Sequence, residues 1–245
     1  MTPRELTYDY VPIATLTHAD RDALWEVYRR HFNADRSEMD ASLGRATHVT
    51  RFRVRKTGEL RGMVAISLKE TEIDGRRFFW LWAGALAIDR DCRGKWLLER
   101  FGLEFIAKFR LRHPFASLIW MYTSISFQSF RMASRSFDEY WPHPDRETPP
   151  WEAKVIDQLT AAEFGDRWDP QAKVLRGDGK KHIRPDSSVT SANDRYREFY
   201  ARINPNAAHG DAVVMMAPLN LKNVLALTKR MTASMREGTR VRQPA

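Results

Sequence analysis

The sequence has very little cysteine and no long apolar run. Its single cysteine, Cys92, excludes an intrachain disulfide and a metal site built from several cysteines. Arg and Lys interrupt every apolar stretch before it reaches the roughly 18 residues that a transmembrane helix needs. The amino-terminal segment also lacks the basic and then apolar order of a signal peptide. We therefore expect a cytoplasmic protein without a transmembrane segment, in a compartment that keeps thiols reduced.

Several functional motifs are missing as well. No cluster of His, Cys, Asp and Glu has the spacing of metal ligands, so we expect no metal cofactor. No nucleophile elbow is present, and Cys92 has no histidine nearby in the sequence that could activate its thiol. Zinc-finger spacing, nucleic-acid-binding motifs and a dense basic arm are also absent, so we expect no nucleic-acid partner.

Positive charge and aromatic side chains are present in excess. The 245 residues include 40 Lys and Arg against 31 Asp and Glu, which gives a formal net charge of +9. This charge suits an acidic partner such as a phosphorylated cofactor, an acidic carrier protein, an anionic membrane surface or nucleic acid, and the even spread of basic residues does not single out the last. The 8 Trp and 13 Phe supply either a bulky core or an apolar pocket.

Apolar periodicity in the first half of the chain predicts alternating strands and helices. The pattern indicates strands at 8–17, 48–56, 61–72 and 77–89, and helices at 18–33 and 37–45. Thr17 is predicted to cap the first helix, and Asp74-Gly75 to form a type I′ hairpin turn. The three strands after the helices should form an antiparallel meander, with the very apolar third strand in the centre of the sheet.

The rest of the chain continues the same α/β pattern. Helices are predicted at 95–112, 124–136, 151–164, 193–202 and 220–237, and strands at 116–122 and 211–217. A crossover helix precedes strand 116–122, so this strand should lie parallel to strand 77–89. The proline-rich segment 143–150 divides a predicted core, residues 1–142, from a carboxy-terminal extension, residues 143–245, that completes the sheet and adds helices.

The most informative stretch runs from Phe78 to His113. An apolar run ends at Ile88, a charged turn follows over Asp89–Lys95, and a helix then begins at once. Such a connection brings free backbone N–H groups, the positive end of a helix and Arg and Lys side chains to one point. It predicts an anion-binding site. The alternative is an ordinary strand-to-helix connection whose charges are solvated.

The order of elements over Tyr8–Trp141 resembles the Gcn5-related N-acetyltransferase (GNAT) superfamily. In that family the strand before the crossover helix ends in a turn of the form Arg/Gln-x-x-Gly-x-Gly/Ala, whose amides hold the pyrophosphate of coenzyme A. Arg93-Gly94-Lys95 matches the opening of this turn, and Ile88 stands where the family often has Val. The resemblance implies a GNAT-like α/β fold: a mixed, largely antiparallel central sheet flanked by helices, with a helical carboxy-terminal elaboration.

The resemblance also implies a set of residues that contact an acyl donor. They are Leu86, Ala87, Ile88, Arg93, Gly94, Lys95, Trp96, Leu97 and Leu98, and a backbone N–H near Leu86–Ile88 would polarise the thioester carbonyl. Trp96 and Leu98 stand where the family has glycine or alanine, which lets the backbone approach phosphate. Three alternatives follow: the pyrophosphate lies further out, the donor is a phosphopantetheine-linked acyl group on a carrier protein, or the site is degenerate.

The resemblance leaves the acid and the base of the reaction open. The family's tyrosine, which protonates the leaving thiolate, falls at Met132-Ala133 here, so that acid is missing. Tyr122 and Tyr140 are candidate substitutes, and Glu70 is the candidate base because family bases line the central strands. Structural roles for the two tyrosines, and a solvated hairpin position for Glu70, are the competing interpretations.

Aromatic residues alternate along two predicted strands. Phe78, Trp80 and Trp82 share one strand face, while Trp120 and Tyr122 share a face of the next strand. They could line an apolar channel for a long acyl chain, or they could simply fill the core.

The sequence therefore predicts an N-acyltransferase that moves an acyl group from acyl-CoA or an acidic acyl carrier protein to a small-molecule amine. One alternative is a long-chain, carrier-dependent enzyme similar to N-acyl amino acid or acyl-homoserine lactone synthases. Another is a non-catalytic binding protein that kept the fold. The acceptor and the oligomeric state stay open.

Overall fold

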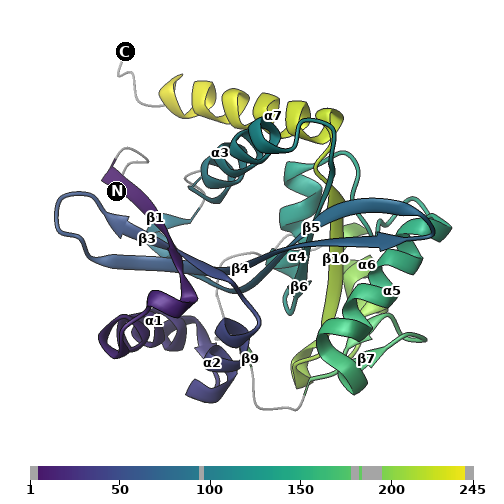
Figure 1. Cartoon of the computed structure of the whole chain (residues 1–245), viewed down its shortest axis with the longest axis horizontal. Coiled ribbons are helices and arrows are strands. Elements are labelled where there is room, and N and C mark those ends of the chain that lie inside the picture. The colour runs from purple at the N-terminus through teal and green to yellow at the C-terminus, as the bar shows by residue number, and fades with distance from the viewer. Residues whose placement is uncertain (1–4, 94–96, 178–181, 184–194, 241–245) are drawn as a thin grey trace.

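The computed structural model describes residues 5–93, 97–177, 182–183 and 195–240 (Figure 1). Its helices are α1 (His18–His31), α2 (Arg36–Gly44), α3 (Leu97–Arg112), α4 (Phe127–Ser136), α5 (Pro150–Phe164), α6 (Arg195–Ile203) and α7 (Leu221–Arg240). Its strands are β1 (Leu6–Pro12), β2 (Phe32–Asn33), β3 (His48–Val54), β4 (Leu60–Ile73), β5 (Arg76–Ile88), β6 (Ser117–Ser124), β7 (Trp168–Asp169), β8 (Val174–Leu175), β9 (His182–Ile183) and β10 (Ala212–Pro218).

One eight-stranded sheet organises the molecule. Its strand order is β1-β3-β4-β5-β6-β10-β8-β7, and β2 and β9 form a separate small pair. The β5–β6 pairing is parallel, and the other pairings in the described sheet are antiparallel. The α3 crossover places β6 beside β5 in this orientation, as a crossover requires. The predicted mixed and largely antiparallel sheet is therefore confirmed.

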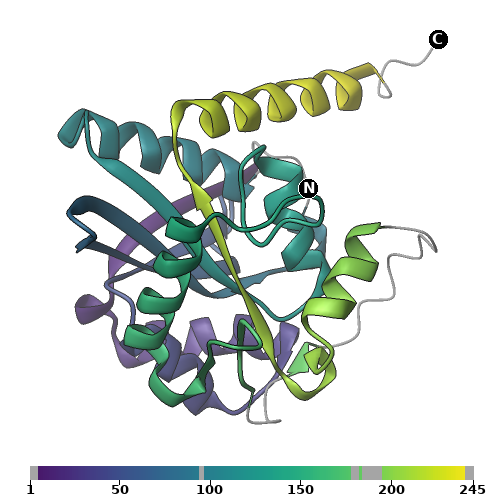
Figure 2. The same cartoon turned by 90° about the vertical axis from the view of Figure 1, so that its right-hand side faces the viewer.

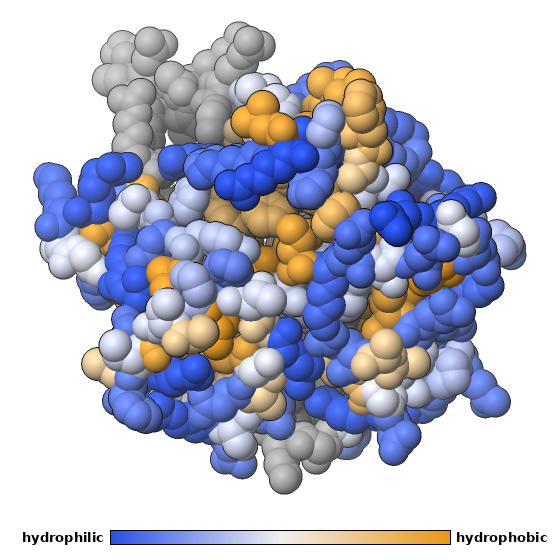
Figure 3. Space-filling view, viewed as in Figure 1, coloured by the Kyte–Doolittle hydropathy of each residue, from blue (hydrophilic) through white to orange (hydrophobic). Residues whose placement is uncertain are grey.

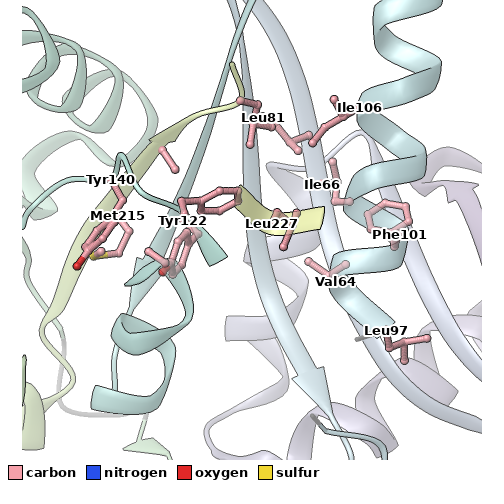
Figure 4. Packing of buried hydrophobic residues seen from close by; sticks show 14 of the residues in the cluster. Val64, Ile66, Leu81, Leu97, Phe101, Ile106, Tyr122, Tyr140, Met215 and Leu227 are labelled. Carbon is pink, nitrogen blue, oxygen red and sulfur yellow. The ribbon is translucent and has the colours of Figure 1, made fainter. Parts of the chain in front are cut away.

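Helices cover both faces of the sheet, and each face has its own core. On one face, α3, α4, α6 and α7 pack against inward-facing residues of β4, β5, β6 and β10. Figure 4 shows this cluster, in which Phe101 and Ile106 of α3 lie against Val64 and Ile66 of β4. On the other face, α1 and α2 cover β3, β4 and the end of β5, while α5 covers β5, β6 and β10. Strand β5 is therefore central and buried on both faces, as its apolar run predicts.

Local sequence signals explain the element boundaries. Thr17 caps α1 with its side chain accepting from the backbone N–H of Asp20, and the Asp20 carboxylate accepts in return from the Thr17 N–H. Asp74 and Gly75 have φ values of 52° and 72°, as a type I′ turn between β4 and β5 needs. Both features were predicted.

The carboxy-terminal part of the chain joins the same sheet. β10 pairs with β6 from Pro218↔Ile119 to Val213↔Ser124, so it extends the sheet beyond the amino-terminal elements. Figure 2 shows β10 running between α5 and α6 and leading into α7, which runs along the top of the molecule in this view. No helix among the described residues is both long and apolar enough to cross a membrane.

Candidate active site

The candidate site lies where β5 and β6 part from each other. Their parallel pairing runs from Phe78↔Ser117 to Ala83↔Tyr122 and stops there. Beyond this point β6 pairs with β10, while Gly84–Ile88 of β5 continue along β4. In these described strands, the edge of β5 over Gly84–Ile88 therefore faces a wedge and not a neighbouring strand. No described strand pairs with β5 along this edge, and the carbonyl of Ile88 accepts from Nε of Arg93 at 2.8 Å.

A β-bulge shapes this part of β5. Gly84 pairs with Ala65 and Ala87 pairs with Met63, so β5 has one more residue than β4 between these pairs. Ala85 within the bulge has φ +46°, a left-handed value that is unusual for alanine. The extra residue reverses the side-chain alternation: before it Leu81 faces the α3 side of the sheet, and after it Ile88 does. The bulge therefore lies in the part of β5 that faces the wedge.

A cavity of about 330 Å³ fills the wedge. Its walls come from the end of β5, the start of α4, the end of α1 and the segments near Arg167 and Gly210. On the space-filling surface in Figure 3, apolar residues show in a hollow near the centre of the face among predominantly polar neighbours. A cavity of this size is typical of small-molecule sites.

The cavity wall is strongly basic. Four arginines line it, Arg30, Arg90, Arg93 and Arg167, against the single acidic residue Glu38. Converging guanidinium groups favour an anionic ligand, and arginine suits phosphate because it donates from a planar fork. The basic character predicted for the turn after β5 is therefore present at the cavity.

Asp89 is the central acceptor of a buried cluster beside this wall. Its side chain is 10% exposed, and its carboxylate accepts from Arg30 at 2.8 Å and lies 3.2 Å from the Nε of Arg61. The Asp89 backbone N–H also donates to the Arg61 carbonyl at 2.8 Å. A buried carboxylate needs such partners because its desolvation is costly. Asp89 thus fixes the start of the turn that follows β5.

His31 lies between Asp89 and Arg93. Its Nε2 is 2.9 Å from Oδ1 of Asp89, and its Nδ1 is 3.0 Å from Nη2 of Arg93. The Nε of Arg93 donates to the Ile88 carbonyl at 2.8 Å, so the guanidinium spans the last residue of β5 and the imidazole. Burial lowers the pKa of His31, and the neighbouring Arg93 charge also lowers it, against the opposing effect of Asp89.

The first turn of α4 forms the wall opposite the bulge. Ser126 caps this helix: its Oγ accepts from the backbone N–H of Ser129, and the Ser129 Oγ accepts from the Ser126 N–H. Ser126, Gln128 and Ser129 all line the cavity. The positive end of a helix therefore points toward the wedge, where it favours negative charge.

Tyr122, one of the three predicted catalytic residues, lines the cavity. Its hydroxyl donates to the Ser129 carbonyl at 3.0 Å, and burial raises its pKa well above the ordinary value. The phenol is therefore protonated at neutral pH. Met132, at the family's tyrosine position, also lines the cavity and carries no acidic group.

Glu70 and Tyr140 lie elsewhere. Glu70 is near the β4–β5 hairpin, where its carboxylate is 47% exposed and lies 3.7 Å from Arg77. Tyr140 is buried in the core on the α3 side, and burial raises the pKa of its hydroxyl. Neither residue lines the cavity.

The predicted donor-binding residues are mostly brought together. Leu86, Ala87, Ile88, Arg93 and Leu98 line the cavity, whereas Leu97 is buried in the core beside it. Gly94, Lys95 and Trp96 lie outside the described residues.

A second, apolar cavity of about 90 Å³ adjoins the first between the sheet and α3. The two cavities share five wall residues, Ala83, Leu86, Leu98, Trp120 and Met132. The structure separates the two sets of aromatic residues for which a channel and core filling were the alternatives. Phe78, Trp80 and Trp82 face α5 on the opposite side of the sheet, because their pairing partners in β6 alternate with Trp120 and Tyr122. Trp120 alone among these tryptophans lines the cavities.

Several wall residues escaped prediction. Arg30, His31 and Glu38 come from α1 and α2, and Arg167 and Gly210 come from the carboxy-terminal part. They carry no shared motif, since the fold alone brings these distant segments together. His31 ends α1 and reads in the sequence as an ordinary helix-terminal histidine. No group of three or more potential metal ligands exists among the described residues.

The chain matches no family model and no curated protein. Solved structures share part of its arrangement. An Escherichia coli GNAT family N-acetyltransferase (YhbS) in complex with CoA is 18% identical over 56% of this chain and 76% of that chain, with a TM-score of 0.36. FeeM, an N-acyl amino acid synthase from uncultured soil microbes, is 10% identical over 54% and 78%, with a TM-score of 0.38.

Saccharomyces cerevisiae N-myristoyltransferase with bound myristoyl-CoA is 13% identical over 51% of this chain, with a TM-score of 0.37, and this chain spans only 35% of its length. At these values the assignment of the fold rests on the strand order, the parallel β5–β6 pair and the wedge between them. A mixed, largely antiparallel sheet flanked by helices, with strand 116–122 parallel to strand 77–89, is what the sequence predicts, and the predicted fold class is confirmed.

Proposed function

We propose that the protein is an N-acyltransferase that binds a thioester donor in the wedge between β5 and β6. The observation that carries this proposal is the free edge of β5 over Gly84–Ile88, which faces a 330 Å³ cavity with an arginine-rich wall. A pantetheine arm is a chain of amides, so it can pair with a strand edge as another strand would. The phosphate end of the donor then meets the arginines.

Each wall of the cavity has a role in this proposal. Backbone N–H groups near Leu86–Ile88 bind the donor and polarise the thioester carbonyl, which gains negative charge as the amine attacks. Arg93 contacts the phosphate. The amino-terminal turn of α4 stabilises the leaving thiolate through its helix dipole. Tyr122 is the candidate donor of a proton to the thiolate, because it alone of the three predicted catalytic residues lines the cavity.

The apolar side cavity supports an acyl group longer than acetyl. It adjoins the wedge at Ala83 and Leu86, near the position proposed for the thioester. An apolar cavity of about 150 Å³ can hold a benzene ring, so about 90 Å³ has room for a few methylene groups. We therefore propose a donor with a short or medium acyl chain, whose tail enters this side cavity.

Two donor carriers fit the basic wall. Coenzyme A brings a pyrophosphate and a further phosphate, while a carrier protein brings one phosphate and an acidic surface. The positive net charge of +9 and the four arginines of the wall favour either anionic carrier. An amine of a small molecule is the proposed acceptor, and it would enter from the side of α2 and Arg167.

Calorimetric titration tests the proposal. Acetyl-CoA, octanoyl-CoA and an octanoyl carrier protein are each titrated into the full chain, and into Arg93→Ala. We expect at least one of these donors to bind and Arg93→Ala to weaken it about tenfold or more, as loss of a charge-assisted contact to phosphate should. Arg77→Ala, an exposed arginine at the far β4–β5 hairpin, is the matched control and should bind as the wild type does.

The non-catalytic alternative makes a different prediction. A scaffold that kept only the fold would bind none of the three donors, and Arg93→Ala would then change nothing measurable. Binding of a donor without release of free thiol, when a mixture of primary amines is added, would indicate a binding protein. Thiol release that depends on the amine would support the transferase.

A further inference from the structure

Four large apolar side chains are exposed where α3 ends and α7 begins. They are Leu111 (86% exposed), Phe115 (98% exposed), Leu221 and Leu225, and we call them the apolar corner. Among the described residues they account for four of the five exposed large hydrophobic side chains. Figure 3 shows apolar residues near the top of the face, over the start of α7. None of the four lines either cavity, and a group of exposed apolar side chains at one place marks a binding surface.

Arg110 holds the two segments of this corner together. Its guanidinium donates to the carbonyl of Ala116 and, at 3.1 Å, to the carbonyl of Leu219. Phe115 directly precedes Ala116, and Leu221 follows Leu219 by two residues. The turn after α3 and the start of α7 are therefore neighbours, although about 100 residues separate them in the sequence.

Helix α7 has one apolar face toward the core and another that is exposed. Val224 and Leu227 belong to the core on the α3 side of the sheet. Leu221 and Leu225 are four residues apart, so they share a face of the helix, and both are exposed. The folded chain thus leaves apolar surface in water here, which is unfavourable unless a partner covers it.

The segments that carry the apolar corner contain basic residues and no acidic ones. Neither 105–117 nor 219–232 includes Asp or Glu. Their Lys and Arg residues are Lys108, Arg110, Arg112, Lys222, Lys229 and Arg230. Three acids outside the two segments, Glu104, Asp138 and Glu139, form ion pairs with Lys108, Arg230 and Lys222. The exposed Arg112 and Lys229 add further positive charge beside the apolar side chains.

The neighbouring β4–β5 hairpin does not offset this charge. It lies beside Phe115, because Phe78 at the start of β5 pairs with Ser117. Over 69–77 the hairpin has as many acidic as basic residues. The apolar corner therefore has a positively charged surround, which complements a negatively charged partner.

We propose that the apolar corner binds the surface of an anionic lipid bilayer. The four apolar side chains insert among the lipids, and the surrounding Lys and Arg residues contact the negatively charged headgroups. A bilayer accepts side chains that protrude singly, as Phe115 does, whereas a protein partner needs a surface of matching shape. Lys and Arg can lay their apolar stems along the lipid boundary while their charged ends stay in the headgroup region. This surface is separate from the donor site, so its role does not depend on the proposed function.

Co-sedimentation with lipid vesicles tests the proposal. The full chain is mixed with vesicles of phosphatidylcholine alone, and with vesicles of phosphatidylcholine and phosphatidylserine in equal amounts. We expect binding to the mixed vesicles to be about tenfold or more tighter than to the neutral ones, and to weaken as salt is added. Equal binding to both kinds of vesicle, or no binding to the mixed vesicles, would overturn the proposal.

Substitutions of exposed residues identify the surface. Phe115→Ser should weaken binding to the mixed vesicles about tenfold or more, and Phe115→Trp should retain it, because tryptophan suits the membrane interface. Arg112→Glu should also weaken it about tenfold or more. Lys56→Glu makes the same change of charge in the β3–β4 turn, at the other end of the 14-residue β4 from the hairpin beside Phe115, and should bind as the wild type does. Unchanged binding by Phe115→Ser and Arg112→Glu would overturn the proposal.

Other partners for this corner give different outcomes. A second copy of the chain would appear in sedimentation velocity as a dimer that Phe115→Ser dissociates. An acidic protein partner would appear if the octanoyl carrier protein bound the wild type, Phe115→Ser lost that binding, and the mixed vesicles were not bound. Either result would overturn the membrane proposal. Phe115→Ser should bind a thioester donor as the wild type does, since Phe115 lines neither cavity, so the vesicle test and the donor titration fail independently.

Discussion

At the scale of single residues, Asp89 has more structural consequence than any other charged group of the site. It is a buried carboxylate with contacts to Arg30, His31 and Arg61, and it stands where β5 ends and the turn begins. Removing a partner from a buried ionic cluster leaves the remaining charges desolvated and unpaired, which is more costly than losing an exposed pair.

This contrast can be measured with two neighbouring aspartates that both contact Arg61. Asp89→Ala should destabilise the protein by about 3–5 kcal/mol. Asp91→Ala should cost roughly 0–1 kcal/mol, because the Asp91 carboxylate is 48% exposed. Urea unfolding of both variants at pH 7 provides the comparison. Equal losses would show that Asp89 is not the structural centre of the turn.

Glu99 presents a different case, since it is a carboxylic acid among the residues that line the apolar side cavity. Burial raises its pKa above the ordinary value, so the folded protein holds this proton more tightly than the unfolded chain does. Glu99 therefore contributes fully to the free energy of unfolding below its pKa in the unfolded chain, near pH 4. This contribution is lost as the pH rises through the pKa of Glu99 in the folded protein.

Glu99→Gln removes this titration. The variant should be more stable than the wild type at pH 7 and about equally stable at pH 4, because a neutral side chain carries no desolvated charge. Denaturant unfolding at the two pH values measures the difference. A variant that is less stable at pH 7 would indicate that the carboxylate has a stabilising partner.

At the scale of elements, the bulge in β5 coincides with the place where the site opens. Ala85 adopts a left-handed backbone conformation that costs an ordinary residue roughly 1–2 kcal/mol. Glycine relieves this cost and loses roughly 0.5–1 kcal/mol through chain entropy, besides about 0.8 kcal/mol for one buried methyl group. In Ala85→Gly, the relief of backbone strain and the losses of chain entropy and methyl burial therefore nearly cancel.

Two alanines in the same strand allow a matched test. Ala85→Gly should change the free energy of unfolding by less than about 1 kcal/mol, whereas Ala87→Gly should cost about 1–2 kcal/mol because Ala87 is buried and has no positive φ. Thermal and urea unfolding distinguish them. If Ala85→Gly were the more damaging change, the bulge would not have this conformation.

In our account, the acyl chain passes from the wedge into the side cavity where the two cavities share wall residues, and this passage limits the chain length that the site accepts. Ala83 of β5 lines both cavities, so Ala83→Leu should fill the passage without reaching the phosphate end of the wedge. We expect octanoyl-CoA to bind about tenfold or more weakly and acetyl-CoA to bind nearly as before. Calorimetry with both donors measures this split. A parallel loss for the two would show that the side cavity does not hold the chain.

Local signals predicted most of the elements, but not the features that make the site. A few consecutive residues are enough to predict each of three features: the cap at Thr17, the Asp74-Gly75 turn and the buried strand β5. The bulge at Ala85 has no such signal, because alanine does not favour a left-handed conformation and the bulge is visible only in the pairing of β5 with its neighbour β4. The same bulge resets which side chains of β5 face α3, so strand alternation alone could not place the wall.

At the scale of the whole molecule, the site is a product of long-range assembly. Its walls come from α1, α2, β5, β6, α4 and the segments near Arg167 and Gly210, so no window of the sequence contains it. The resemblance to a known family predicted the β5 and Arg93 side because that side is continuous in sequence. It gave no indication of His31, Arg30 or Arg167, whose positions depend on how distant elements pack.

The carboxy-terminal part completes the site as well as the sheet. β10 lies beside β6, and Gly210 and Ala212 line the cavity. Gly177 donates its N–H to Asp211 at 2.8 Å, and a side chain at Gly177 would overlap the backbone of Gly210. Gly177→Ala should therefore destabilise the protein by about 1–3 kcal/mol in urea unfolding. Gly44→Ala, whose new Cβ would meet no neighbour and whose φ is not positive, is the matched control and should change the stability little.

The central claim is that a thioester donor lies along the free edge of β5. A crystal structure with a non-hydrolysable octanoyl-CoA thioether tests it most directly. We predict that the pantetheine arm pairs with Gly84–Ile88, that a phosphate contacts Arg93, and that the octanoyl tail enters the cavity beside Leu98 and Met132. A ligand bound elsewhere, or an empty wedge at a saturating concentration of ligand, would contradict the account.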